Sequence, residues 1–209
     1  MGRGEQARSD ILDAAEQLIA ERGVRVPLRE IAIAAGQRNN SAVNYYFHNR
    51  RELIRAVVAR RLDPMERERA EMLAALDDIH DVESMLRILV QPLTTVDSDY
   101  YTRFLQAAAL YLPTDLDGTQ GTVWPRVLEE LARAIPTTDP AAKRRRIGAV
   151  GTAMFALLAE WERTSRSDAT AVNFPEEIVT MLGAMLTAPV HPAAAAGEPA
   201  TPTGRTTSA

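Results

Sequence analysis

The sequence has no cysteine, few aromatic residues and no long hydrophobic run, and each shortage excludes a kind of protein. Without cysteine there is no disulfide framework, no thiolate nucleophile and no cysteine-bound metal. The longest apolar run, residues 147–159, has about 13 residues, whereas a helix needs about 20 to cross a membrane. We therefore expect a buried helix there and no membrane partner. The acidic residues from Glu5 to Glu16 argue against a signal peptide.

Histidine is also scarce, and no catalytic pattern is present. His48, His80 and His191 are scattered, and no two of them have the spacing of metal ligands. The sequence contains no GxSxG, P-loop or HExxH pattern. We therefore expect no metal, no cofactor and no catalytic residues, and we do not expect an enzyme.

The composition that remains favours helices. Of the 209 residues 46% are hydrophobic, but only 5% are aromatic, and alanine and leucine are abundant while β-branched runs are short. The net charge of −4 is unevenly distributed: residues 1–62 hold 11 arginines against 7 acidic residues, and the rest of the chain is acidic. An all-α fold with a basic head on an acidic body suits a protein whose N-terminal part binds a polyanion.

Apolar residues at the 3.6-residue period, with helix-stopping residues between them, predict about nine helices. The N-terminal ones are expected at about 6–22, 28–35 and 40–46. Asn49 is a plausible N-cap for a fourth helix that continues to about residue 76, kinked at Pro64. Further helices are predicted at about 82–96, 98–112, 121–135, 139–165 and 174–187. The expected domains are a helix-turn-helix domain over 1–49, a ligand-binding and dimerisation domain over 50–188, and a disordered tail over 189–209 that is rich in proline, alanine and threonine.

The second and third helices, with a glycine-containing turn between them, form a helix-turn-helix unit. Such a unit places the start of its second helix in the major groove of DNA. Asparagine can bond adenine in two places and arginine can bond guanine in the same way, while tyrosine and arginine suit phosphate oxygens. The candidate DNA-binding residues are Arg29, Arg38, Asn39, Asn40, Ser41, Asn44, Tyr45, Tyr46, His48, Arg50 and Arg51.

A simpler interpretation of these polar residues is a surface turn with helix caps, since asparagine and serine favour turns for local reasons. That interpretation accounts for single asparagines. It gives no reason for Tyr45, Tyr46 and the Arg50–Arg51 pair to follow within about two helical turns.

The segment from Ile11 to Leu53 resembles the N-terminal DNA-binding domain of TetR-family transcriptional regulators. The stretches that carry the resemblance are 11–23, 28–36 and 42–54. The chain departs from the common pattern of that family at residues 43–47, which read Val-Asn-Tyr-Tyr-Phe, and it has one more residue in the turn over 37–40.

The resemblance implies a homodimer in which the last two helices pair with their mates, and middle helices that surround a ligand pocket. Gly148, Gly151, Thr152 and Ala156 form a stripe of small residues, and Ile178, Met181, Leu182 and Met185 give the last helix an apolar face. Both faces could instead pack within one subunit. The candidate ligand-binding residues are Met85, Leu89, Tyr101, Phe104, Tyr111, Trp124 and Phe155, for each of which core packing is the alternative.

Together these features predict a cytoplasmic one-component transcriptional regulator, a repressor that binds a palindromic operator of double-stranded DNA and is released by a small-molecule effector. The fourth helix would connect ligand pocket and head, with Pro64 a candidate hinge. Two other classes stay open: a helical small-molecule-binding protein or enzyme without a DNA role, and an architectural DNA-binding protein without an effector.

Overall fold

The computed structural model describes residues 2–37, 41–111, 123–164 and 173–190. These residues form nine α-helices and one 3-10 turn, and they contain no strand, so the expected all-α class is confirmed. The predicted tail lies, beyond Val190, outside the described residues. The helices are α1 (Arg3–Arg22), α2 (Leu28–Ala34), α3 (Ser41–Tyr46), α4 (Arg50–Ala74), α5 (Val82–Thr94), α6 (Tyr101–Ala108), the 3-10 turn η1 (Ala109–Tyr111), α7 (Val123–Ala134), α8 (Pro140–Thr164) and α9 (Phe174–Thr187).

Helix α1 begins three residues before the predicted start because the Gly2 backbone N–H donates to the Glu5 carboxylate at 3.0 Å. An error of equal size is at the start of α6, which begins at Tyr101 rather than near residue 98. There the Ser98 hydroxyl accepts the Tyr100 backbone N–H at 3.1 Å and holds the chain in a turn before the helix. A hydroxyl that competes for backbone donors favours a turn over a helical start.

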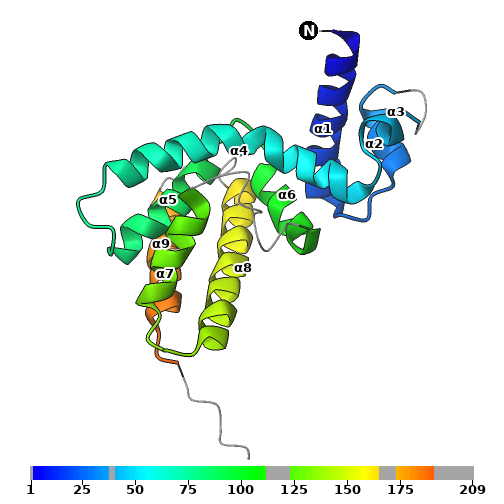
Figure 1. Ribbon diagram of the computed structural model, residues 1–209. Helices are drawn as coiled ribbons and strands as arrows, with labels where there is room; N and C mark the ends of the chain where they lie inside the picture. Colours follow the sequence, from blue (N-terminus) through cyan, green and yellow to red (C-terminus); the bar gives the residue numbers. More distant parts are fainter. Residues whose placement is uncertain (1, 38–40, 112–122, 165–172, 191–209) are drawn as a thin grey trace, which may run out of the picture.

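The N-terminal head consists of α1, α2 and α3, and α4 leads from it along the helical body (Figure 1). The Asn49 side chain accepts the Glu52 backbone N–H at 3.0 Å, which is the predicted cap of α4. The helix continues past Pro64 for a length of about 37 Å at about 1.5 Å per residue. One element therefore spans both head and body.

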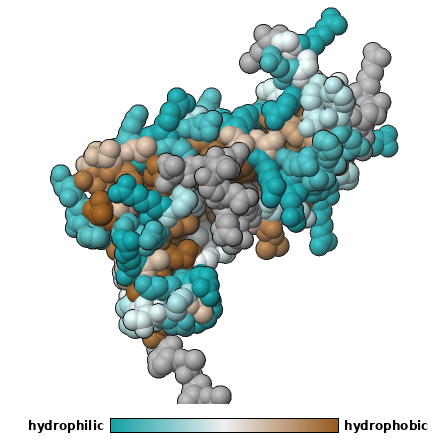
Figure 2. Space-filling view, in the orientation of Figure 1, coloured by the Kyte–Doolittle hydropathy of each residue, from teal (hydrophilic) through white to brown (hydrophobic). Residues whose placement is uncertain are grey.

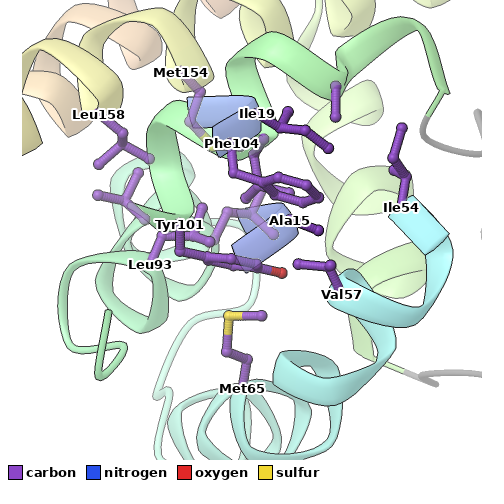
Figure 3. Packing of buried hydrophobic residues seen from close by; sticks show 14 of the residues in the cluster. Ala15, Ile19, Ile54, Val57, Met65, Leu93, Tyr101, Phe104, Met154 and Leu158 are labelled. Atoms are coloured by element: carbon purple, nitrogen blue, oxygen red, sulfur yellow. The ribbon is translucent and has the colours of Figure 1, made fainter. Parts of the chain in front are cut away.

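In the body, α9 packs between α5 and α8, and α6 packs against α8 on one side and α1 on the other. Tyr101 and Phe104 of α6 are fully buried, with their rings stacked 6.1 Å apart. Figure 3 shows these rings surrounded by side chains from α1, α4, α5 and α8, among them Ile19 and Met154. The core of the head is thus continuous with the core of the body.

Two buried glutamates hold the start of α6 from opposite sides. Glu16 of α1 accepts from Arg60 at 2.8 Å, from Arg61 at 3.2 Å and from the Ser98 hydroxyl. Arg61 also donates to the Asp97 carbonyl at 2.8 Å. Because α1, α4 and the segment before α6 all meet at one buried carboxylate, the head is attached to the body by more than apolar contact.

The second glutamate is Glu162 of α8. Its carboxylate accepts the backbone N–H groups of Thr102 at 2.9 Å and Arg103 at 3.2 Å, and also the Arg103 Nε at 2.8 Å. The first N–H groups of a helix have no partner within the helix, and Glu162 supplies one for α6.

None of the helices in the described residues is long and apolar enough to cross a bilayer.

Candidate nucleic-acid interface

The turn between α2 and α3 is formed by a left-handed glycine. Gly36 has a φ of 70°, which side chains with a Cβ rarely adopt. Its N–H donates to the Ile33 carbonyl at 3.0 Å, and the N–H of Gln37 donates to the Ala32 carbonyl at 2.9 Å. This pair of bonds is the Schellman ending of a helix. The sequence therefore ends α2 sharply and turns the chain toward α3.

Helix α3 is anchored by two residues one turn apart. Val43 and Phe47 are buried, and Arg8 of α1 lies over the Phe47 ring at 5.3 Å. Asn44 and Tyr45 consequently face away from the core, and Tyr45 is 79% exposed. Tyr46 is half-buried, and its ring meets that of Tyr45 edge to face at 5.0 Å. The exposed side of α3 thus presents an amide and a phenol.

The polar residues after α3 have different surroundings. His48 is exposed and its Nδ1 lies 3.1 Å from the Glu52 carboxylate. Arg50 is half-buried, and its Nη1 donates to the Val24 carbonyl at 2.7 Å, so it ties the start of α4 to the turn after α1. Arg51 is exposed, and no acidic partner for it lies among the described residues. Of the two neighbouring arginines, Arg51 is the one whose guanidinium has no partner within the described part of the chain.

Several other arginines of the head are exposed and have no carboxylate partner within the described part of the chain: Arg25, Arg29 and Arg55. Arg60 and Arg61 are used internally by Glu16. The head therefore keeps positive charge on its outside. Figure 2 shows that this face of the head is mostly hydrophilic. Unpaired, exposed cations of this kind attract phosphates and release counterions on binding.

Four of the predicted DNA-binding residues cannot be placed. Arg38, Asn39 and Asn40 lie outside the described residues, as does the side chain of Ser41. The other seven come from α2, from α3, from the segment between α3 and α4, and from the start of α4. Among them, Arg29, Asn44, Tyr45, His48 and Arg51 are exposed, whereas Tyr46 and Arg50 are half-buried.

The predicted ligand-binding residues occupy the body. Met85 and Leu89 of α5 and Tyr101 and Phe104 of α6 are buried in the core. The remaining three, Tyr111, Trp124 and Phe155, are half-buried and pack against that core.

Sequence reasoning missed three charged residues that the structure buries: Glu16, Arg69 and Glu162. Each lies on the apolar stripe of its helix: Glu16 follows Leu12 by four residues, and Glu162 follows Leu158 in the same way. Residues four apart share a helix face. A charged residue in an apolar position of the periodic pattern is the signal that could have found them.

Comparisons with known proteins agree with this geometry. Residues 11–57 match the family model for bacterial regulatory proteins of the tetR family. No curated protein matches the sequence. The structure of native NalD, the secondary repressor of the MexAB-OprM multidrug efflux pump in Pseudomonas aeruginosa, is 20% identical, covers 87% of this chain and 96% of that chain, and has a TM-score of 0.50. A structural-genomics protein from Rhodococcus sp. RHA1, proposed to be a transcriptional regulator, is 21% identical, with 88% and 96% covered and a TM-score of 0.45.

Proposed function

We propose that this chain, whose residues 11–57 match the family model for bacterial regulatory proteins of the tetR family, is a repressor that binds a palindromic operator as a homodimer. A small-molecule effector in the body releases it from DNA. It acts in the cytoplasm, where its operator is, and it has no enzymatic role.

The observation that carries the proposal is that α3 has one buried apolar side and one exposed polar side. Val43 and Phe47 fix the helix to the core, and this leaves Asn44 and Tyr45 exposed on the opposite side. A helix that enters the major groove needs side chains that donate and accept hydrogen bonds on its outer face. Asn44 is the candidate for base contact, and the exposed arginines Arg29 and Arg51 are candidates for phosphate contact.

The dimer is supported by apolar surface on α8 and α9. Met181 and Met185 are 39% and 37% exposed, whereas Ile178 and Leu182 of the same helix are buried within the subunit. On α8, a Cβ at Gly148 would meet no atom within 4 Å. The last helix therefore buries part of its apolar stripe within the subunit and leaves the adjacent part, at Met181 and Met185, exposed. Two recognition helices about 34 Å apart would meet successive major grooves.

The route from effector to head is the contact between α6 and α1 together with the continuous α4. Glu16 joins these elements at one buried carboxylate. An effector that binds better when α6 has shifted would change the position of the head, and only such a difference in affinity can transmit a signal. Pro64 stays a candidate hinge within α4.

The test is DNA binding by the full chain. The probe is the DNA upstream of its own gene, with a shuffled fragment of equal composition as the control, titrated at several salt concentrations. The proposal expects tighter binding to the upstream fragment and a linear fall of log affinity with log salt. Addition of cell extract should weaken binding to the upstream fragment. Equal, salt-insensitive affinity for both fragments would refute a role at an operator.

A further inference from the structure

Arg69 of α4 is a charged side chain buried in the body with most of its hydrogen-bonding capacity unused. It is 2% exposed. Its Nη1 donates to the Glu66 carboxylate at 2.8 Å, and within the described residues this is the one hydrogen bond of the guanidinium. The Nε is sealed from solvent and has no partner there. The edge formed by Nε and Nη2 can hold two oxygens side by side, and no hydrogen bond to a described residue uses it.

Leaving this edge free is costly. A buried N–H without an acceptor loses its bonds to water and gains none in return. Burial lowers the pKa of Arg69 despite the opposing bond to Glu66, so the site disfavours the charge that it contains. An apolar side chain would fill such a position without that cost. A buried arginine whose Nε makes no hydrogen bond within the described residues therefore calls for a further partner.

A second polar group of the buried core lies close to α4. This is the Tyr101 hydroxyl, and its burial raises its pKa. Figure 3 shows this hydroxyl pointing toward α4, between Val57 and Met65. Met65 and Arg69 are four residues apart and so lie on one face of that helix.

A third residue, Trp124 at the start of α7, lies next to Arg69. Its ring lies 4.8 Å from the centre of the Arg69 guanidinium. The neighbouring Val123 N–H donates to the second oxygen of the Glu66 carboxylate at 3.2 Å. Stacking on an aromatic ring fixes the plane of a guanidinium and leaves its edges available. Glu66 binds the Nη1 of Arg69, and the Trp124 ring fixes the plane of the guanidinium.

We propose that Arg69, Tyr101 and Trp124 form the recognition end of an effector site, and that the effector is an organic carboxylate with an apolar body. The Nε–Nη2 edge takes both carboxylate oxygens, and the Tyr101 hydroxyl donates a third hydrogen bond. Trp124, Met65 and Phe104 supply apolar surface for the rest of the molecule. This inference rests on the proposed function in that it names the chemical class of its effector.

The site also explains how such a ligand could act. The three residues come from α7, from α4, which reaches the head, and from α6, which packs on α1. Since the Nε is sealed, a carboxylate reaches it only when neighbouring side chains move apart. The ligand therefore favours an altered arrangement of α4 and α6 over the present one, which is the differential binding that regulation needs.

The test measures binding of benzoate and octanoate to the full chain, with benzamide and octanamide as uncharged matches, by calorimetry and by thermal unfolding. The carboxylates should raise the melting temperature, and the amides should bind at least about tenfold more weakly. Arg69→Lys keeps the charge but loses the fork, and should weaken carboxylate binding by about tenfold or more. Arg87→Lys is the matched control, because Arg87 is bound to Glu176 at the surface and its change should leave binding intact.

Three results would overturn the inference: equal binding of amide and carboxylate, wild-type binding by Arg69→Lys, or no binding of either carboxylate at about 10 mM. If Arg69→Lys does not fold, Tyr101→Phe decides, because it should weaken carboxylates and leave amides unchanged. Operator binding is measured on the same samples. Specific DNA binding without carboxylate binding would refute this site alone. Carboxylate binding through Arg69 in a protein that ignores DNA would refute the proposed function alone.

Discussion

Arg50 and Arg51 are neighbours in the sequence but have different surroundings. Arg50 donates to the Val24 carbonyl and so supports the turn after α1, whereas Arg51 is exposed. The periodicity of the sequence assigns both arginines to the start of the same helix and cannot predict that their surroundings differ. The difference comes from a carbonyl 26 residues away, which only the folded chain brings near.

This difference predicts distinct outcomes for two substitutions. Arg51→Ala should weaken binding to all DNA sequences and reduce the slope of log affinity against log salt by about 0.9, the value for one phosphate contact. Its melting temperature should not change.

Arg50→Ala should lower the free energy of unfolding by about 1.5–3 kcal/mol, the range for a hydrogen bond to a charged group. Arg126→Ala on α7 is the matched control, since Arg126 is exposed on the body. An unchanged salt slope in Arg51→Ala would contradict this assignment.

Asn44 is expected to act on sequence preference rather than on overall affinity. It is exposed on α3 and can bond an adenine edge with donor and acceptor together. Asn44→Ala should cost about 1–3 kcal/mol on the preferred site and little on a shuffled one. Selection of binding sites from a random library would show relaxed preference at one position per half-site. A uniform loss on every sequence would point instead to a phosphate contact.

At the scale of elements, local signals predicted most of the helices. Asn49 caps α4, and Gly36 ends α2 by a left-handed turn. Both devices work over three or four residues, so a single sequence contains them in full. The links made by Glu16 and Glu162 were not predictable in this way. Their partners lie 44–82 residues away for Glu16 and 59–60 residues away for Glu162, and no local pattern identifies such partners.

The cap of α5 gives a prediction about pH. The Asp81 carboxylate accepts the Ser84 backbone N–H at 3.0 Å, and its bonds to Ser84 hold the pKa of Asp81 below its ordinary value. A lowered folded pKa means that this stabilisation is present above the unfolded pKa and is lost as pH falls through the folded pKa. Asp81→Ala should cost about 1 kcal/mol at neutral pH. Asp81→Asn keeps an acceptor without the charge, so its difference from wild type should shrink below about pH 4. Urea unfolding at several pH values measures this, and a pH-independent difference would contradict it.

The junction at Glu16 gives a prediction about the link between head and body. Glu16→Gln removes the charge that Arg60 and Arg61 share, so it should lower the free energy of unfolding by about 3 kcal/mol. Asp13→Asn is the matched control: Asp13 also bonds Arg60, but from an exposed position, and its loss should cost less than about 1 kcal/mol. Equal losses of unfolding free energy in the two variants would show that burial of Glu16 does not strengthen its ion pairs. Hydrogen exchange should locate the loosening in α1 and in the segment before α6.

At the scale of the whole molecule, the basic residues 1–62, which form the head and the first half of α4, are separated from an acidic body. Helix α4 and the contact of α1 with α6 connect the two parts (Figure 1). The charge imbalance and the apolar faces could be read from the sequence. Which apolar side of α9 stays outside could not, because Ile178, Met181, Leu182 and Met185 all fit one helical stripe. Packing against α5 and α8 buries the first and third of these and leaves the two methionines exposed.

The exposed methionines provide the test of assembly. A charge at Met181 or Met185 would have to be desolvated in a dimer formed through α9, whereas it would remain solvated in a monomer. Met181→Lys together with Met185→Lys should therefore yield a folded monomer by sedimentation, with a melting temperature that no longer depends on protein concentration. Ile33→Lys is the control, because Ile33 is 59% exposed but belongs to α2 in the head.

The double variant should also lose affinity for a two-half-site operator while each half-site is still bound weakly, because the second head is no longer held at a matching distance. A double variant that remains dimeric would exclude this face of α9 as the subunit interface.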